Sequence, residues 1–184
     1  EPMTANSSEG MVGAQAAWKA GYTGAGSKIA IIDTGIDTSH QSFDADAFNY
    51  SITQAGAGSE LLTQAQVQSL ASQLNSKSSN YVSAKIPYGY NYVDGSTTIN
   101  HLSDTQGEHG SHVASIAAAN KFIYSEDDGS ITLNSALKTV RSQGNAPDAQ
   151  LLIMKVFGSS GGAYDSDYFV AIEDAIVLGA DSVN

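Results

Sequence analysis

The sequence predicts an α/β fold built around a parallel sheet, and three observations support that prediction. Residues 28–33 and 149–158 form two runs that are apolar at nearly every position. Strands of a parallel sheet are buried on both faces and have this composition, whereas strands with one wet face alternate. Helical patterns lie between and after the runs, in the strand–helix order of such a sheet. Apolar residues make up 41% of the 184 residues, enough to fill a core.

The expected elements follow in order along the chain. Residues 1–27 are polar and rich in glycine, with a short helix expected at 12–19, before the first strand. Helices are expected at 109–120 and 166–178, and Gly179 follows the second in a position that favours a left-handed cap. The last residues, "GADSVN", begin a further apolar segment that stops short of the usual strand length of about five or six residues. This favours the first part of a domain, with a short final edge strand as the alternative.

Two polar segments interrupt this pattern. Residues 51–85 are rich in Ser, Gln and Ala, and Thr63 with Gln66 matches a capping box. The apolar residues Val67, Leu70 and Leu74 then recur at helical spacing. We therefore expect a surface insertion at about 51–85 that carries one amphipathic helix. Residues 121–146 are expected to form a second polar insertion.

Composition excludes several classes of function. The formal net charge is −11 with eight Lys and Arg residues and no basic cluster, so no nucleic-acid partner is expected. The chain has no cysteine, which excludes disulfides, thiolate metal sites and a cysteine nucleophile. No apolar stretch approaches 18 residues, so no membrane-spanning segment is expected in this chain.

Asp33 and His109 form the most promising chemical pair. Asp33 ends the first strand, and ligands of open parallel sheets bind at the carboxyl ends of the strands. His109 begins a helix, so its ring can project into the same crevice. A carboxylate that accepts a hydrogen bond from one imidazole nitrogen fixes the tautomer and leaves the other nitrogen free to take a proton from a nucleophile. This is half of a general-base device.

The same residues allow two other interpretations. A single Asp-Thr-Gly does not make an aspartic protease, because that mechanism needs two such carboxylates. His109 and His112 are three apart and could ligate a metal, but the zinc-protease spacing of four with an intervening Glu is absent. We expect His112 to be buried and structural, on the side of Ile116, and His40 and His101 to be solvated in polar loops.

Several sequence motifs, and their order along the chain, resemble those of a known protein family. "IAIIDTGIDTSH" resembles the aspartate block of subtilisin-like serine proteases, and "EHGSHVASIAAA" resembles their histidine block. "APDAQLLIMKVFGSSGG" resembles the segment that follows, and "ADSVN" the start of the next strand. Nearly the whole chain outside the insertions is covered, and the triad of subtilisin follows the order Asp, His, Ser along the chain. "KIPYGYNYVDG" further resembles bacterial cell-envelope proteinases of the lactocepin type.

The resemblance implies a three-layer subtilisin-like fold and a role for each matching residue. Asp33 would be the triad aspartate and His109 the general base and then acid, while Gly110 would let the backbone pass close at the helix start. Phe157 would line the pocket for the residue two before the cut. Ser160, Gly161 and Gly162 would form a backbone edge that pairs with an extended substrate, the alternative being a flexible loop. Ser111 and Ser115 depart from the usual Thr and Gly, and both changes are small.

Comparison with the family pattern also identifies catalytic groups that this sequence does not contain. The family's Gly-Thr-Ser-Met-Ala nucleophile block is not in the chain, nor is its oxyanion Asn, so the serine is expected on a downstream segment or a second chain. The alternatives are a non-catalytic fragment that serves binding or assembly, and a metal hydrolase that uses His109, His112 and an acidic residue. The resemblance implies a protein or peptide substrate, a secreted or cell-surface bacterial location and no cofactor for the chemistry. Structural calcium is possible, with Asp44, Asp46 and residues 126–128 as acidic positions to which no ligand role can be assigned.

Overall fold

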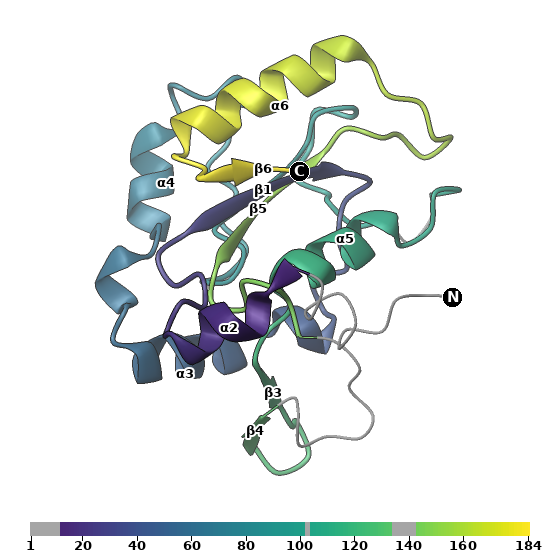
Figure 1. The fold of residues 1–184 in the computed structure, drawn as a ribbon. Helices are drawn as coiled ribbons and strands as arrows, with labels where there is room; N and C mark the ends of the chain where they lie inside the picture. The colour runs from purple at the N-terminus through teal and green to yellow at the C-terminus, as the bar shows by residue number, and fades with distance from the viewer. Residues whose placement is uncertain (1–11, 102–103, 134–142) are drawn as a thin grey trace.

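The computed structural model describes residues 12–101, 104–133 and 143–184. A four-stranded sheet lies at its centre, with the strand order β2-β5-β1-β6 and every neighbouring pair parallel (Figure 1). The described strands are β1 (Lys28–Asp33), β2 (Tyr88–Asn91), β3 (Phe122–Tyr124), β4 (Ile131–Leu133), β5 (Gln150–Lys155) and β6 (Ser182–Val183). The described helices are α2 (Ala14–Lys19), α3 (Ala45–Ala55), α4 (Gln64–Leu70), α5 (His109–Ala118) and α6 (Asp165–Val177), with short 3-10 turns η1 (Gln41–Phe43) and η2 (Gly58–Glu60).

The two central strands are buried on both faces, as their composition predicted. Even-numbered side chains such as Ile32 and Met154 pack in one apolar cluster with residues of α4 and α6. Odd-numbered side chains such as Ile31 and Ile153 pack in a second cluster with residues of α5. The alternation follows from the two-residue period of a strand. It directs Asp33, the last residue of β1, to the α5 face.

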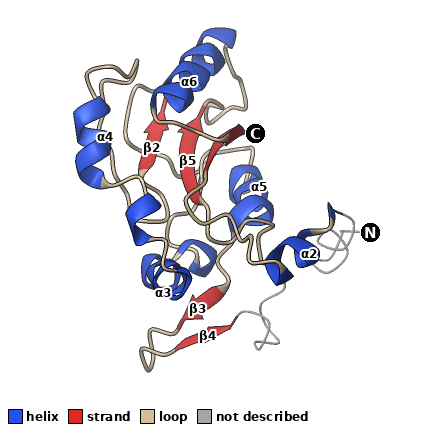
Figure 2. Ribbon diagram, turned by 60° about the vertical axis from the view of Figure 1, so that its left-hand side comes forward, coloured by secondary structure: helices blue, strands red, loops and turns tan. Residues whose placement is uncertain are grey.

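Helices cover both faces of the sheet and give the three layers of the expected α/β architecture. In Figure 1, α6 lies on one side of the sheet and α5 on the other. The buried positions of α5 are Gly110, Ala114 and Ala118, four residues apart, so one stripe of small residues faces the sheet. Figure 2 shows α3 and the β3–β4 hairpin together at the end of the molecule away from α6.

The expected elements agree closely with the observed ones. The strand at 28–33 is confirmed, and the second central strand and the two main helices are confirmed to within a few residues. Gly179 has the expected left-handed backbone, with φ of 73°. The capping box of Thr63 and Gln66 is present at the start of α4. At the end of the chain, β6 pairs in parallel with β1.

Residues 51–85 contribute to the core. They hold the end of α3, η2 and α4, rather than the single helix expected. Val67 and Leu74 are fully buried in the cluster that underlies α6. The segment therefore covers part of one sheet face.

Buried polar side chains attach this segment to the sheet layers at two points. The Gln150 amide accepts from the Leu62 backbone N–H at 2.7 Å and donates to the Leu62 carbonyl at 3.1 Å. The Asp174 carboxylate on α6 accepts from the backbone N–H groups of Asn75 at 2.6 Å and Ser76 at 3.1 Å. Gln150 and Asp174 are both fully buried. Residues 62–76 are thus fixed at both ends.

The second polar segment forms a small hairpin. β3 and β4 pair in antiparallel fashion, and Phe122 packs edge-on against Tyr50 of α3. Residues 134–142 of the expected insertion lie outside the described residues.

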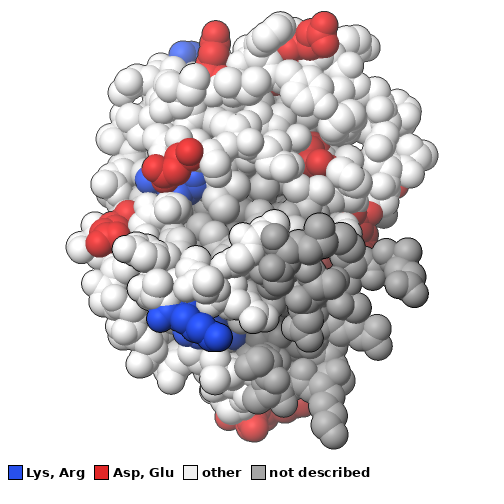
Figure 3. Space-filling view, in the orientation of Figure 1, with Lys and Arg blue, Asp and Glu red and all other residues white. Residues whose placement is uncertain are grey.

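The positions of the basic side chains and the lengths of the helices are as follows. On the face shown in Figure 3, the Lys and Arg side chains of the described residues are few and lie apart. Among the described helices, none has the length and apolar character needed to span a bilayer.

Candidate active site

Asp33 and His109 are in direct contact at the carboxyl end of the sheet. The Nδ1 atom of His109 lies 2.9 Å from Oδ1 and 3.0 Å from Oδ2 of Asp33. The Asp33 side chain is 11% exposed, whereas that of His109 is 64% exposed. An ionised carboxylate can only accept a hydrogen bond, so His109 donates through Nδ1–H. Its Nε2 atom then carries the free lone pair. A buried carboxylate that orients an accessible imidazole is suited to general-base catalysis.

Glycine allows the two elements to approach this closely. A Cβ on Gly110 would lie 2.1 Å from the carbonyl oxygen of Gly35, so no larger residue fits without a backbone shift. Gly35 itself has φ of 100°, and a Cβ there would lie 2.2 Å from the Ile99 carbonyl oxygen. The expected role of Gly110 in this close approach is confirmed.

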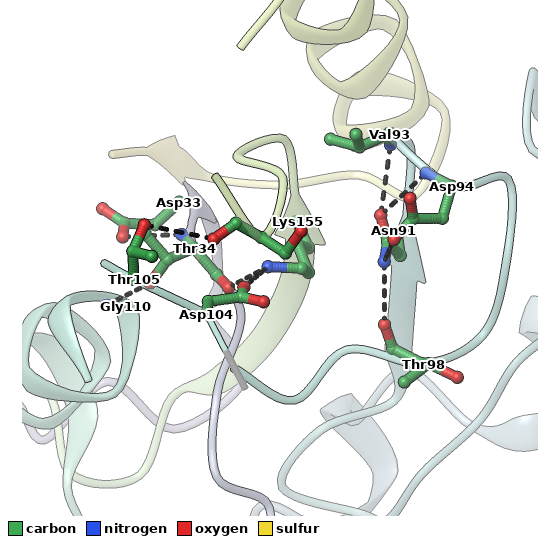
Figure 4. A network of polar contacts seen from close by, with 11 residues as sticks. Asp33, Thr34, Asn91, Val93, Asp94, Thr98, Asp104, Thr105, Gly110 and Lys155 are labelled. Carbon is green, nitrogen blue, oxygen red and sulfur yellow. Dashed lines mark hydrogen bonds and ion pairs between the residues drawn. The ribbon is translucent and has the colours of Figure 1, made fainter. Parts of the chain in front are cut away.

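Hydrogen bonds and an ion pair connect Asp33 and His109 to the neighbouring strand and loops (Figure 4). The Thr34 backbone N–H donates to Asp33 Oδ1 at 2.7 Å, and the Gly110 N–H donates to Thr34 Oγ1 at 2.9 Å. The Lys155 ammonium donates to the Thr34 carbonyl at 2.7 Å and forms an ion pair with Asp104. These bonds therefore join the turn after β1 to the end of β5 and to the start of α5.

The residues expected to bind substrate follow directly after β5. Phe157 is half-buried and its ring stacks edge-on against Tyr168 of α6, with centroids 5.8 Å apart. Residues 158–162 form a tight turn in which the Gly158 N–H donates to the Gly162 carbonyl at 2.9 Å. Ser160 and Gly162 are exposed and Gly161 is half-buried. These residues lie at the same edge of the sheet as Asp33, because they follow the strand that pairs with β1 in register.

Tyr168 adds an aromatic side chain that was not predicted from the sequence. Burial raises the pKa of its phenol above the ordinary value, and the Asp33 charge raises it further. The phenol therefore stays protonated at neutral pH. Its ring and that of Phe157 form an edge-on aromatic pair close to the end of β5.

The other histidines differ from expectation in two of three cases. His112 is exposed, not buried, because the stripe of Gly110, Ala114 and Ala118 faces the sheet and leaves His112 on the outer side. Ile116, taken as a marker of the buried side, is 45% exposed. His101 is buried, at 2% exposed, not solvated.

His101 is buried because its segment runs alongside the turn after β1, where the Ile36 N–H donates to the Ile99 carbonyl at 2.8 Å. Neither of its ring nitrogens has a hydrogen-bond partner within the part of the chain that the structure describes. His40 is exposed as expected, and its Nδ1 accepts from the Ser42 N–H at 3.2 Å.

A small cleft lies on the outer side of α5. It has a volume of about 250 Å³ and is lined by polar residues. Ser39 lowers the pKa of Asp37, one of these residues, by donating hydrogen bonds to its carboxylate. The lining residues are Asp37, His40, Ser42, Glu108, Ser111, His112 and Ser115.

The acidic positions considered for calcium do not gather into a site. The Asp44 carboxylate caps α3 by accepting from the Ala47 N–H at 2.8 Å. Asp128 accepts from the Ser130 N–H at 3.0 Å within its own turn. In residues 12–101, 104–133 and 143–184, no three His, Asp or Glu side chains lie close enough together to hold a metal ion.

The supporting network was not predicted from the sequence. Lys155 was visible as a charged residue at the end of a mostly apolar strand, where a buried charge needs a partner. Its partner Asp104 is 51 residues away in the sequence, so the pairing itself needed the fold.

Comparisons with known proteins agree with the geometry. The model of the subtilase family matches residues 24–184. The PI-type proteinase of Lactococcus lactis subsp. cremoris is 36% identical over 183 residues, which is 95% of this chain and 8% of that protein. The C5a peptidase of Streptococcus pyogenes serotype M6 is 31% identical over 169 residues, covering 88% of this chain and 12% of that protein. The minor extracellular protease Vpr of Bacillus subtilis (strain 168) is 28% identical over 178 residues, covering 94% and 15%.

Proposed function

Because this chain belongs to the subtilase family, we propose that it supplies the aspartate and histidine of a serine endopeptidase that hydrolyses peptide bonds of proteins. The family and the protease names of its relatives support a serine protease. The chain spans about 8% of the length of the lactococcal proteinase it matches, so the activity is a proposal for the protein to which these residues belong. The observation that carries it is the contact between Asp33 and His109 Nδ1, at 2.9 Å.

The proposed reaction is acyl transfer. His109 Nε2 takes the proton of a serine hydroxyl as the oxygen attacks the scissile carbonyl, and Asp33 stabilises the imidazolium that forms. His109 then returns the proton to the leaving amine, and water hydrolyses the acyl-enzyme by the same steps in reverse. The serine and the oxyanion donors come from a downstream segment or a second chain, because the family's nucleophile block is not among these residues.

The proposed substrate is an extended peptide. Phe157, with Tyr168 beside it, offers an apolar wall for a substrate side chain, and Ser160, Gly161 and Gly162 offer a backbone edge for strand addition. The exposure of Ser160 and Gly162 is consistent with that role. One bacterial relative is named an extracellular protease and the others reported are bacterial too, which supports a secreted or surface-exposed bacterial protein. Structural calcium is retained as a proposal without named ligands, and the proposed reaction needs no cofactor.

A fluorophosphonate probe tests the proposal directly. It labels an activated serine, so intact mass spectrometry of the native material should reveal a probe-bearing species that contains, or co-purifies with, this chain. The His109→Ala variant is the matched control and should lose the label, because the serine then lacks its base. Native material that binds no probe would refute the protease proposal and favour a non-catalytic binding or assembly role.

A further inference from the structure

A buried ion pair lies beneath the turn that carries Asp33. Lys155 ends β5 and is the register partner of Asp33 in the neighbouring strand. Its side chain is 3% exposed, and that of its partner Asp104 is 6% exposed. Two charges removed from water are tolerated only while they stay in contact and hydrogen-bonded. The pair therefore fixes the position of everything that is bonded to it.

One branch of bonds runs from this ion pair to the general base. The Lys155 ammonium holds the Thr34 carbonyl at 2.7 Å. Thr34 in turn donates its N–H to the Asp33 carboxylate and accepts the Gly110 N–H on its hydroxyl. Gly110 directly follows His109. Movement of Thr34 would thus displace both partners of the Asp33–His109 contact.

A second branch runs to the proposed substrate edge. The N–H and the hydroxyl of Thr105, next to Asp104, both donate to the Ser159 carbonyl, at 2.9 and 3.1 Å. The next side chain, Gln106, covers Gly161 so closely that a Cβ on that glycine would lie 2.0 Å from its amide nitrogen. The segment 104–106 therefore links the ion pair to the turn at 158–162. Figure 4 shows Asp104, Thr105 and Lys155 next to Asp33 and Thr34.

We propose that Asp104 and Lys155 are positioning residues for peptide-bond hydrolysis, holding the Asp33–His109 pair and the 158–162 turn in one fixed relation. The inference rests on the proposed function, because it assigns the ion pair a role in that reaction. Neither residue touches the reacting atoms. Each acts through Thr34 or Thr105.

A second buried lysine provides a matched control. Lys85 is fully buried and donates to the carbonyls of Pro147 and Ala149, at the other end of β5. Lys85→Met removes a buried amino group that also donates to backbone carbonyls, without touching the network at Asp33. If Lys155 only stabilised the fold, then Lys155→Met and Lys85→Met would have similar effects on catalysis.

The experiment compares four forms of the intact protein: wild type, Lys155→Met, the double variant Lys155→Met with Asp104→Asn, and Lys85→Met. Each is examined for thermal stability, for kcat and KM on a peptide substrate, and for the His109 Nδ1 proton in the NMR spectrum. A hydrogen bond to a carboxylate moves that proton far downfield of most others. The double variant is included because it leaves no unpaired buried charge and so should fold even where the single variant does not.

We expect Lys155→Met and the double variant to lower kcat about 10- to 100-fold, the loss that a misplacement of about 1 Å causes. Their downfield proton should shift or broaden, while Lys85→Met keeps kcat within about two-fold and leaves that proton unchanged. Recovery of both readouts in the double variant would overturn the proposal, since stability alone would then explain the single variant. If the wild type neither cleaves peptides nor binds the fluorophosphonate, the proposed function fails, and the NMR comparison still decides whether Lys155 orients His109.

Discussion

Two lysines are buried at opposite ends of β5, and the structure compensates their charges differently. At the carboxyl end, Lys155 contacts the Asp104 carboxylate and one carbonyl. At the amino end, Lys85 contacts the carbonyls of Pro147 and Ala149, and its ammonium lies 4.8 Å from the centre of the Phe48 ring.

The electrostatic consequence is visible at Lys85. Burial lowers its pKa from 10.5 to about 7, and the nearby charge of Asp148 offsets only part of that effect. A neutral amine still has two N–H groups, enough for both carbonyls. The amino end of β5 thus needs hydrogen-bond donors from Lys85 and can lose its charge. At the carboxyl end, by contrast, Lys155 contacts a carboxylate next to the candidate catalytic residues.

The largest expected effect comes from replacing Asp33, which ends β1 beside the carboxyl end of β5. Asp33→Asn preserves the side-chain shape but presents an amide to His109, which favours the wrong imidazole tautomer. We expect kcat on a peptide substrate to fall about 10⁴-fold, the loss seen when a triad aspartate is replaced in this way. Asp181→Asn is the control, because Asp181 pairs with Lys28 at the exposed amino end of β1. Equal activity in the two variants would contradict the role of Asp33.

Gly110→Ala tests the close approach that brings His109 to Asp33. The added methyl meets the Gly35 backbone, so α5 must move away from the turn. Overpacking of this kind costs about 1–3 kcal/mol of unfolding free energy, and the displacement should lower kcat about 100-fold.

Gly58→Ala is the matched control for that variant, since a Cβ on Gly58 would meet nothing within 4 Å. Chemical denaturation and steady-state kinetics provide the two readouts. Wild-type kcat in Gly110→Ala would mean that the contact tolerates a wider separation than we infer.

A smaller effect is expected from Lys85, at the amino end of β5, as a dependence of the unfolding free energy on pH. Since the pKa of Lys85 is lower in the folded protein than in the unfolded chain, the unfolded chain binds more protons between about pH 7 and 10.5. Stability should therefore rise with pH over that range through this group. Burial raises the pKa of Tyr88 to about 12, so the tyrosines should reverse the trend above about pH 10.

Lys85→Met should remove the rising part of that curve. It should also cost about 1–3 kcal/mol, because two buried carbonyls lose their donors. Urea unfolding at several pH values measures both effects. A rising limb that persists in Lys85→Met would show that another group is responsible.

The ends of β5 also show what the sequence could and could not predict. The contact between Asp33 and His109 could be expected from the sequence, because each residue lies in a distinctive motif and its position at a strand end or helix start is set locally. His112 was misplaced because Ile116 was taken to mark the core, whereas small residues at Gly110, Ala114 and Ala118 form the buried stripe. Apolarity was a poorer guide than residue size, because α5 must lie very close to the sheet.

Long-range pairings were not predictable for a different reason. The contacts of Lys155 with Asp104 and of Lys85 with Pro147 join residues 51 and 62 positions apart. Of these four residues only Lys155 lies in a strand, so the loops that the fold places at the two ends of β5 bring the partners together. The sequence shows Lys155 within an apolar run, whereas Lys85 ends a segment that was expected to be a surface insertion, and neither position carries a local signal for its partner.

The two attachment points of residues 62–76 have a consequence for how the molecule opens. The Gln150 side chain mimics one peptide group of an additional strand, and Asp174 caps the other end of the segment. A loop held only at its surface would exchange its amide hydrogens by local fluctuation. Here the Leu62 and Asn75 amides bond to groups that are released only when β5 or α6 comes apart. Hydrogen exchange should therefore record these two amides opening together with the central sheet, as members of one cooperative unit.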